Sequence, residues 1–69
     1  EWDEVIRGIK KADEAGLKDD GKFALMKGIA YFEKKSITNA KNSFIEASNS
    51  KEYKDQGIAW LEYLEALNG

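Results

Sequence analysis

Apolar residues recur at intervals of three and four along four stretches of the chain, which is the spacing of helices that bury one face. These stretches cover residues 2–14, 21–33, 37–48 and 53–67. The second stretch is apolar on more than one face, so it should pack against neighbours on two sides. Short polar turns separate the stretches, and the chain contains no proline. The pattern predicts an all-α fold of about four antiparallel helices.

Small and large residues alternate in the middle of the chain so that two helices can lie close together. Ala24 and Gly28 leave the second predicted helix without bulk where its neighbour must approach. Six such residues hold positions 4, 8, 11, 20, 24 and 27 of a segment that starts at Gly21: Ala24, Gly28, Tyr31, Ala40, Phe44 and Ala47. This order resembles the tetratricopeptide repeat, a helix–turn–helix unit of 34 residues.

The resemblance implies a single domain of antiparallel helix–turn–helix units stacked into a superhelix. Residues 21–54 would form one full repeat, residues 1–16 the second helix of a preceding repeat, and residues 54–69 a following or capping helix. The chain opens on Glu1 and ends just after an apolar stretch, so we expect it to be part of a longer protein.

Two positions depart from the family's pattern, and a second architecture stays open. Lys27 stands where the family usually has leucine, and Glu52 stands where it usually has proline. The stem of Lys27 can lie along apolar surface, and a glutamate can occupy a turn. The competing interpretation is an unrelated four-helix bundle. In both architectures, Gly57 lies in the first turn of the last helix, where glycine lowers helix propensity.

A narrower resemblance bears on the origin of the chain. Gly16-Leu17, residues 28–31 and residues 60–64 are similar to the C-terminal repeats of tetratricopeptide proteins from Gram-negative bacteria. Some of those proteins are associated with TonB-type energy transduction. This similarity implies a bacterial protein and favours the periplasm or cell envelope over the cytoplasm.

Composition narrows the classes of function. The net charge of −2 comes from interleaved acidic and basic residues, and no basic stripe suggests a nucleic-acid partner. The chain has neither histidine nor cysteine, so imidazole catalysis, thiolate chemistry and zinc sites are excluded. It also lacks a glycine-rich phosphate loop. No apolar run reaches the ~20 residues of a membrane span. We therefore expect a non-enzymatic protein without cofactor, metal or membrane insertion.

The resemblance also implies a binding surface. In the tetratricopeptide family, set positions on the first helix of each repeat line a concave face that holds a segment of another protein or peptide. Carried over, these positions are Lys22, Leu25, Ile29, Phe32, Gln56, Ala59 and Tyr63. The face would be largely apolar, with Lys22 and Tyr63 as polar groups. Chaperone-binding members carry Lys and Asn where this chain has Leu25 and Ile29, and these two side chains cannot hydrogen-bond the terminal carboxylate of a chaperone tail.

The alternative function is purely architectural. The same concave residues could pack inside the protein, and the chain could be a structural segment that associates with further repeats or with itself. The apolar face of the first helix predicts such self-association: Trp2, Val5, Ile6 and Ile9. Trp60 is expected in the core, because a tryptophan at helical spacing is usually buried. Ile45 is expected to face inward on the third helix.

Overall fold

The computed structural model describes residues 1–14 and 21–68 and consists of four helices. Their bounds are α1 Trp2–Glu14, α2 Lys22–Glu33, α3 Ile37–Ser48 and α4 Lys54–Asn68. Each helix begins and ends within one residue of its predicted position, and the described residues contain no strand. The predicted all-α fold is therefore confirmed. Gly16 and Leu17, and with them the predicted boundary at residue 16, lie outside the described residues.

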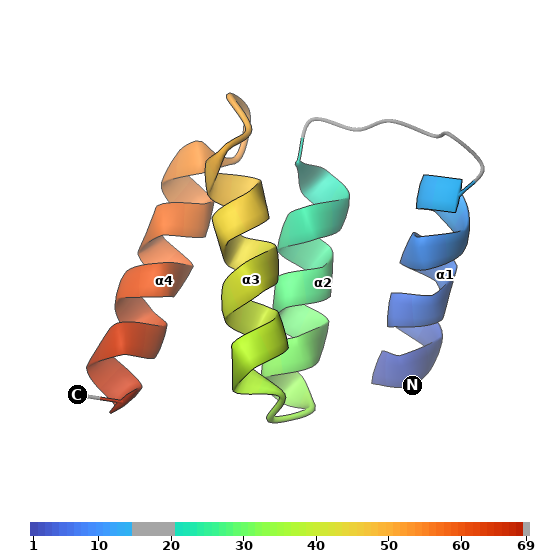
Figure 1. The fold of residues 1–69 in the computed structure, drawn as a ribbon, viewed down its shortest axis with the longest axis horizontal. Coiled ribbons are helices and arrows are strands. Elements are labelled where there is room, and N and C mark those ends of the chain that lie inside the picture. The colour runs from blue at the N-terminus through green and yellow to red at the C-terminus, as the bar shows by residue number, and fades with distance from the viewer. Residues whose placement is uncertain (15–20, 69) are drawn as a thin grey trace.

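The helices lie side by side in chain order and alternate in direction (Figure 1). The closely packed pairs are α1 with α2, α2 with α3 and α3 with α4. The Cα atoms span 38 × 28 × 13 Å, so the arrangement is flat. The helices thus form a flat row in chain order, with α1 and α4 at opposite edges. Packing of each helix against the next is compatible with a helical repeat.

The core lies where α2 and α4 meet α3. Phe44 of α3 is fully buried and packs with Ala40 and Leu64. Gly28 is buried directly over the Phe44 ring, where a Cβ atom would lie 2.8 Å from Cζ and closer still to Cε1. Contact that close is below the usual van der Waals distance, so only glycine fits there. The close approach predicted from small residues is confirmed; Ala24, Ala40 and Ala47 are also buried.

Gly57 has a role that helix propensity did not reveal. It is buried in the first turn of α4, and a Cβ atom there would lie 2.7 Å from Ser48 N and 2.9 Å from Phe44 O. These are backbone atoms of α3, so the two helices approach each other at main-chain distance. Gly57 therefore permits the packing of α4, and its cost in propensity is secondary.

Lys27 shows how the chain accommodates a charge where the tetratricopeptide pattern has leucine. Its side chain is only 17% exposed, and its Nζ lies 3.6 Å from Oε1 of Glu46 on α3. The stem is covered while the ammonium group reaches a carboxylate at the surface, as predicted for a long cationic side chain. This residue joins α2 to α3 without breaking their packing.

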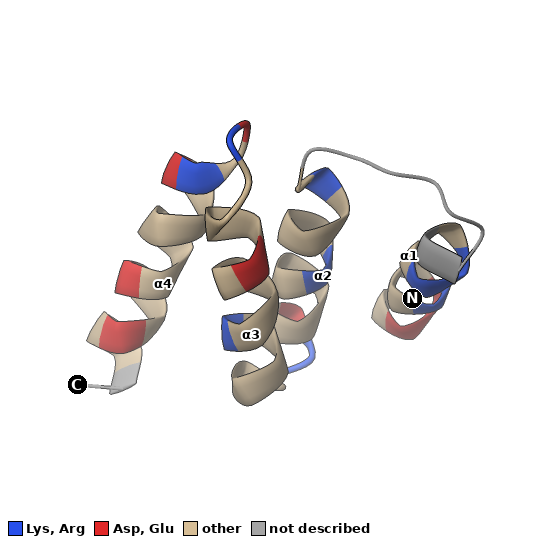
Figure 2. Cartoon of the chain, turned by 45° about the horizontal axis from the view of Figure 1, so that its top comes forward, with Lys and Arg blue, Asp and Glu red and all other residues tan. Residues whose placement is uncertain are grey.

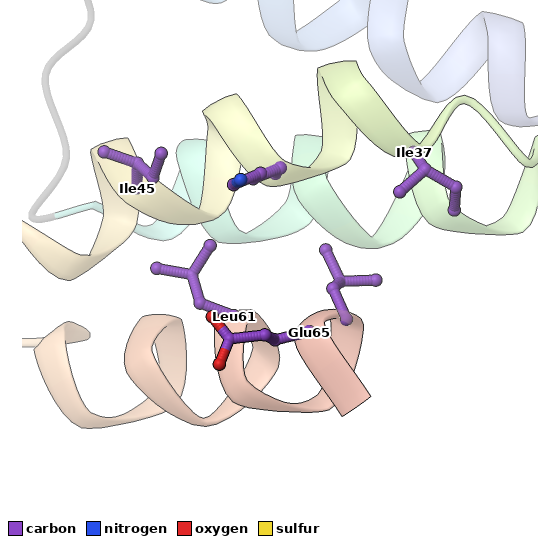
Figure 3. Close-up of a pocket in the computed structure, with 6 residues that line it drawn as sticks. Ile37, Ile45, Leu61 and Glu65 are labelled. Carbon is purple, nitrogen blue, oxygen red and sulfur yellow. The ribbon is translucent and has the colours of Figure 1, made fainter. Parts of the chain in front are cut away.

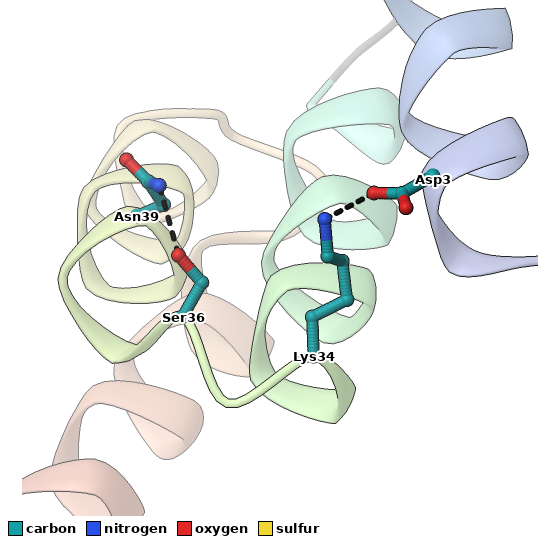
Figure 4. A network of polar contacts seen from close by, with 4 residues as sticks. All are labelled: Asp3, Lys34, Ser36 and Asn39. Atoms are coloured by element: carbon teal, nitrogen blue, oxygen red, sulfur yellow. Dashed lines mark hydrogen bonds and ion pairs between the residues drawn. The ribbon is translucent and has the colours of Figure 1, made fainter.

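The turn between α2 and α3 is closed by backbone hydrogen bonds. The N–H of Ser36 donates to Tyr31 C=O at 2.8 Å, and the N–H of Lys35 donates to Phe32 C=O at 2.9 Å. This pair of bonds is the Schellman motif, which requires a left-handed residue, and here that residue is Lys35 with φ 65°. Ser36 precedes α3, but its Oγ accepts from Asn39 Nδ2 at 2.9 Å and makes no side-chain bond to the helix backbone (Figure 4).

Replacing Lys35 with glycine is expected to stabilise the protein by about 0.5–1 kcal/mol. A residue with a side chain in the left-handed region costs ~1–2 kcal/mol, and glycine removes this strain. Part of the gain is offset, because glycine makes the unfolded chain more flexible. Urea denaturation of Lys35→Gly measures the effect. Lys35→Ala is the matched control, since it removes the same side chain but keeps the strain, and it should leave the midpoint nearly unchanged. A lower midpoint for Lys35→Gly would contradict the assigned turn.

Candidate functional site

Three aromatic rings gather where α2 and α4 come together on one side of α3. The ring centroid of Phe32 on α2 lies 5.4 Å from that of Trp60 and 5.8 Å from that of Tyr63, both on α4. Trp60 and Tyr63 meet edge to face at 5.8 Å and 84°. These tilted contacts are the favourable geometry for aromatic pairs. Together with Ala59, we call this group the aromatic surface: Phe32, Ala59, Trp60 and Tyr63.

Trp60 links the aromatic surface to the core. Its ring stacks on Phe44, with centroids 4.9 Å apart and planes at 5°. The Trp60 ring also contacts the rings of Phe32 and Tyr63, and the side chain is half-buried. The predicted place of Trp60 in the core is thus correct for the side of its ring that stacks on Phe44, and the residue is also part of the aromatic surface. Because its ring rests on a fully buried residue, the surface that it forms is held rigidly.

A shallow open hollow of about 260 Å³ lies beside these rings, lined by Ala59, Trp60 and Tyr63. Ala59 is exposed and Tyr63 is 49% exposed, so both are accessible from outside. The walls are apolar, with the phenol of Tyr63 as a polar group. A hollow of this kind can receive an apolar side chain of a bound segment. The Tyr63 hydroxyl group can form a hydrogen bond with the backbone of that segment.

The seven predicted binding residues divide into three groups. Phe32, Ala59 and Tyr63 belong to the aromatic surface. Leu25 and Ile29 lie two turns and one turn before Phe32, respectively, on the same face of α2, but they are half-buried and pack against the core. The remaining two residues are exposed near the N-terminal ends of their helices: Lys22 and Gln56. Since α2 and α4 run in the same direction, these polar residues lie at one end of the surface (Figure 1).

The structure corrects the predicted self-association surface of α1. Ile6 and Ile9 are buried, because α1 packs its main apolar face against α2. Only Trp2 and Val5 stay accessible, at 42% and 36% exposure. Two of the four residues therefore cannot meet a second molecule without the separation of α1 from α2.

A larger groove, absent from the sequence predictions, runs between α3 and α4. Its volume is about 360 Å³, and Figure 3 shows it between the two helices. Its lining is apolar apart from one lysine and one glutamate: Ile37, Lys41, Ile45, Leu61, Leu64 and Glu65. Ile45, expected to face inward, is 42% exposed in this groove. The inward face of α3 is instead made by Ala40, Ser43, Phe44 and Ala47.

A polar cleft of about 330 Å³ separates α1 from the end of α2. Lys34 Nζ donates to Asp3 Oδ1 across it (Figure 4). This hydrogen bond and the positive charge of Lys34 lower the pKa of Asp3 below its ordinary value. The ion pair is therefore retained at any pH above the ordinary pKa of aspartate, and it is lost as the pH falls through the lowered pKa of Asp3. Because both groups are exposed, the pair orients α1 more than it stabilises the fold.

The distribution of charge differs between the edge helices (Figure 2). In α4, Lys54 is the only basic residue, whereas Asp55, Glu62 and Glu65 are acidic. On α1, Arg7 and Lys10 line the polar cleft with Lys34. Within residues 1–14 and 21–68, no group of three or more carboxylates is placed to hold a metal ion. None of the described helices combines the length and the apolar character of a membrane span.

Comparison with the models of known protein families, with curated proteins and with solved structures found no match to this chain.

Proposed function

We propose that this chain is a protein-interaction module that binds an apolar segment of another polypeptide on its aromatic surface. The observation that carries the proposal is the gathering of Phe32, Trp60 and Tyr63 beside an open hollow. Aromatic side chains supply large, rigid contact areas and are enriched among the residues that dominate binding energy. The bound segment, extended or helical, would anchor one apolar side chain in the hollow.

We also propose that the helices are tetratricopeptide-like repeats, with residues 21–54 as one complete unit. The packing of Gly28 against Phe44 supports this assignment, since it places a small and a large residue of the repeat pattern in direct contact. The packing of helices that follow one another in the chain supports it as well, because stacked repeats contact mainly their neighbours. The proposed binding surface then lies on the first helices of two consecutive units, α2 and α4.

The polar residues near the surface suggest the orientation of the ligand. Lys22 and Gln56 are exposed near the N-terminal ends of α2 and α4. Lys22 lies ten residues before Phe32, which corresponds to about 15 Å along the helix. A segment of this length that reaches from the hollow to Lys22 would carry its apolar residue at one end and a polar or acidic residue at the other.

Substitution of the exposed surface residues is expected to abolish binding without unfolding the protein. Peptides would first be selected from a random library displayed on phage, and one selected sequence would be synthesised. Its affinity for Ala59→Glu and for Tyr63→Ala should fall by about tenfold or more, because the first change puts a charged side chain at the apolar hollow and the second removes one of its walls. Isothermal titration calorimetry measures the dissociation constants.

Ile58→Glu is the matched control. Ile58 is an exposed apolar residue of α4, adjacent in sequence to Ala59 but on another side of the helix. The control variant should bind the peptide as the unaltered protein does. The proposal fails if no apolar peptide is selected, or if Ala59→Glu and Tyr63→Ala bind as tightly as Ile58→Glu.

A further inference from the structure

The α3–α4 groove combines exposed apolar surface with one charge of each sign. Ile45 is 42% exposed, Leu61 is half-buried and Leu64 lies at the base of the groove. Both charged residues line the groove, Lys41 from α3 and Glu65 from α4, so the two charges come from the two helices that flank it. Figure 3 labels Glu65 on α4. Both charged residues are exposed.

Neither charge has an ion-pair partner among residues 1–14 and 21–68. The ion pairs among the described residues join Lys27 to Glu46 and Lys34 to Asp3, and neither involves Lys41 or Glu65. An apolar strip with opposite unpaired charges on its two sides is complementary to a rotated copy of itself. Self-complementarity is the requirement for a twofold symmetric interface between identical chains.

We propose that this groove is the interface of a homodimer, in which α3 of each copy lies over α4 of the other. A twofold axis parallel to the helices produces this arrangement. It places Ile45 of one copy on Leu61 of the second copy, and it brings Lys41 next to the second copy's Glu65, twice. A twofold axis across the helices would instead oppose like charges, Glu65 to Glu65 and Lys41 to Lys41, which is unfavourable.

The resulting dimer contains a four-helix bundle made of two α3–α4 pairs. Interfaces of standard size bury ~800 Å² of each partner. That would be about a sixth of this chain's accessible surface of 4904 Å². The groove involves one side each of a 12-residue and a 15-residue helix, so we expect a smaller interface and a dissociation constant in the micromolar range.

Dimerisation through the groove leaves the aromatic surface free. On α4, Tyr63 lies two residues from both Leu61 and Glu65, which is about 200° around the helix. The groove and the aromatic surface therefore lie on different sides of α4. A dimer would present two copies of the proposed binding surface, which raises the avidity for a partner with two binding segments.

Charge reversal at the groove tests the proposal. Sedimentation velocity from about 10 µM to about 500 µM should show a monomer–dimer equilibrium for the unaltered protein. Lys41→Glu and Glu65→Lys should each raise the dissociation constant by about tenfold or more, since two attractive pairs per dimer become repulsive. The double variant should restore the constant to within about threefold, because the two charges have only exchanged places.

Glu52→Lys is the control for charge alone, because it makes the same change at an exposed residue of the turn before α4. It should dimerise like the unaltered protein, and circular dichroism should show the same helicity for every variant. The proposal is overturned by a monomer at all concentrations. It is equally overturned by a dimer that the single variants do not weaken, or by a double variant that stays monomeric, since both results indicate a different contact.

Discussion

Phe44→Ala is expected to lower the free energy of unfolding by about 3–5 kcal/mol, the largest loss for any single truncation in this chain. Phe44 is fully buried, supports Gly28 of α2 and stacks on Trp60 of α4. Its removal leaves a cavity between three helices that small side chains cannot fill. A domain of this size rarely exceeds ~3–5 kcal/mol of stability, so the variant should be largely unfolded at room temperature. Far-UV circular dichroism measures the lost helicity.

Two variants separate the loss of the core from the loss of any aromatic ring. Tyr63→Ala removes a half-exposed ring and should cost far less, about 1 kcal/mol or below. Phe44→Leu keeps most of the buried volume and should retain a cooperative urea transition at a lower midpoint. If Phe44→Ala unfolds at nearly the same urea concentration as the unaltered protein, the assigned core is wrong.

Gly57→Ala is expected to destabilise the protein by about 1–3 kcal/mol, although alanine is the better helix former. The added methyl group would overlap Ser48 N and Phe44 O, at 2.7 Å and 2.9 Å. Because both atoms belong to the backbone of α3, relief requires α4 to move as a whole, and overpacking of this kind outweighs the gain in propensity of ~1 kcal/mol.

Gly8→Ala is the matched control in the same protein. Gly8 is an exposed residue within α1, and a Cβ atom there would meet nothing within 4 Å. The same substitution should therefore stabilise the protein by about 0.5–1 kcal/mol through helix propensity alone. Urea denaturation of both variants is expected to shift the midpoint in opposite directions. A rise in the midpoint for Gly57→Ala would show that α3 and α4 do not approach as described.

These glycines illustrate how far the fold can be predicted from the amino-acid order. Helical periodicity gave the four helices to within one residue, and the small residues Ala24 and Gly28 marked the approach of α2 and α3 correctly. Gly57 was interpreted from propensity alone, because the distance between two backbones depends on how the helices cross. That distance is set only when the helices pack, so it cannot be predicted from a local sequence pattern.

In the candidate site, too, part of the structure could be predicted from the sequence, and part depends on how the helices pack. The positions carried over from the tetratricopeptide resemblance put Phe32, Ala59 and Tyr63 on one surface, and the structure does bring these residues together. Spacing along a helix predicts which residues share a face. Spacing does not say which neighbour covers a face. For this reason Ile6 and Ile9 were expected to be accessible although α2 buries them, and Ile45 was expected to be buried although it is exposed. Trp60 was assigned to the core, where one side of its ring does lie.

The claim that an apolar polypeptide segment binds beside Trp60 is tested most directly by nuclear magnetic resonance. The ¹⁵N-labelled protein would be titrated with the peptide selected on phage, and the amide and indole shifts followed. The account predicts saturable changes at the Trp60 indole and at the amides of Phe32, Ala59 and Tyr63, with α1 unaffected. Changes confined to Ile45 and Leu61 in the α3–α4 groove, or to α1, would contradict it.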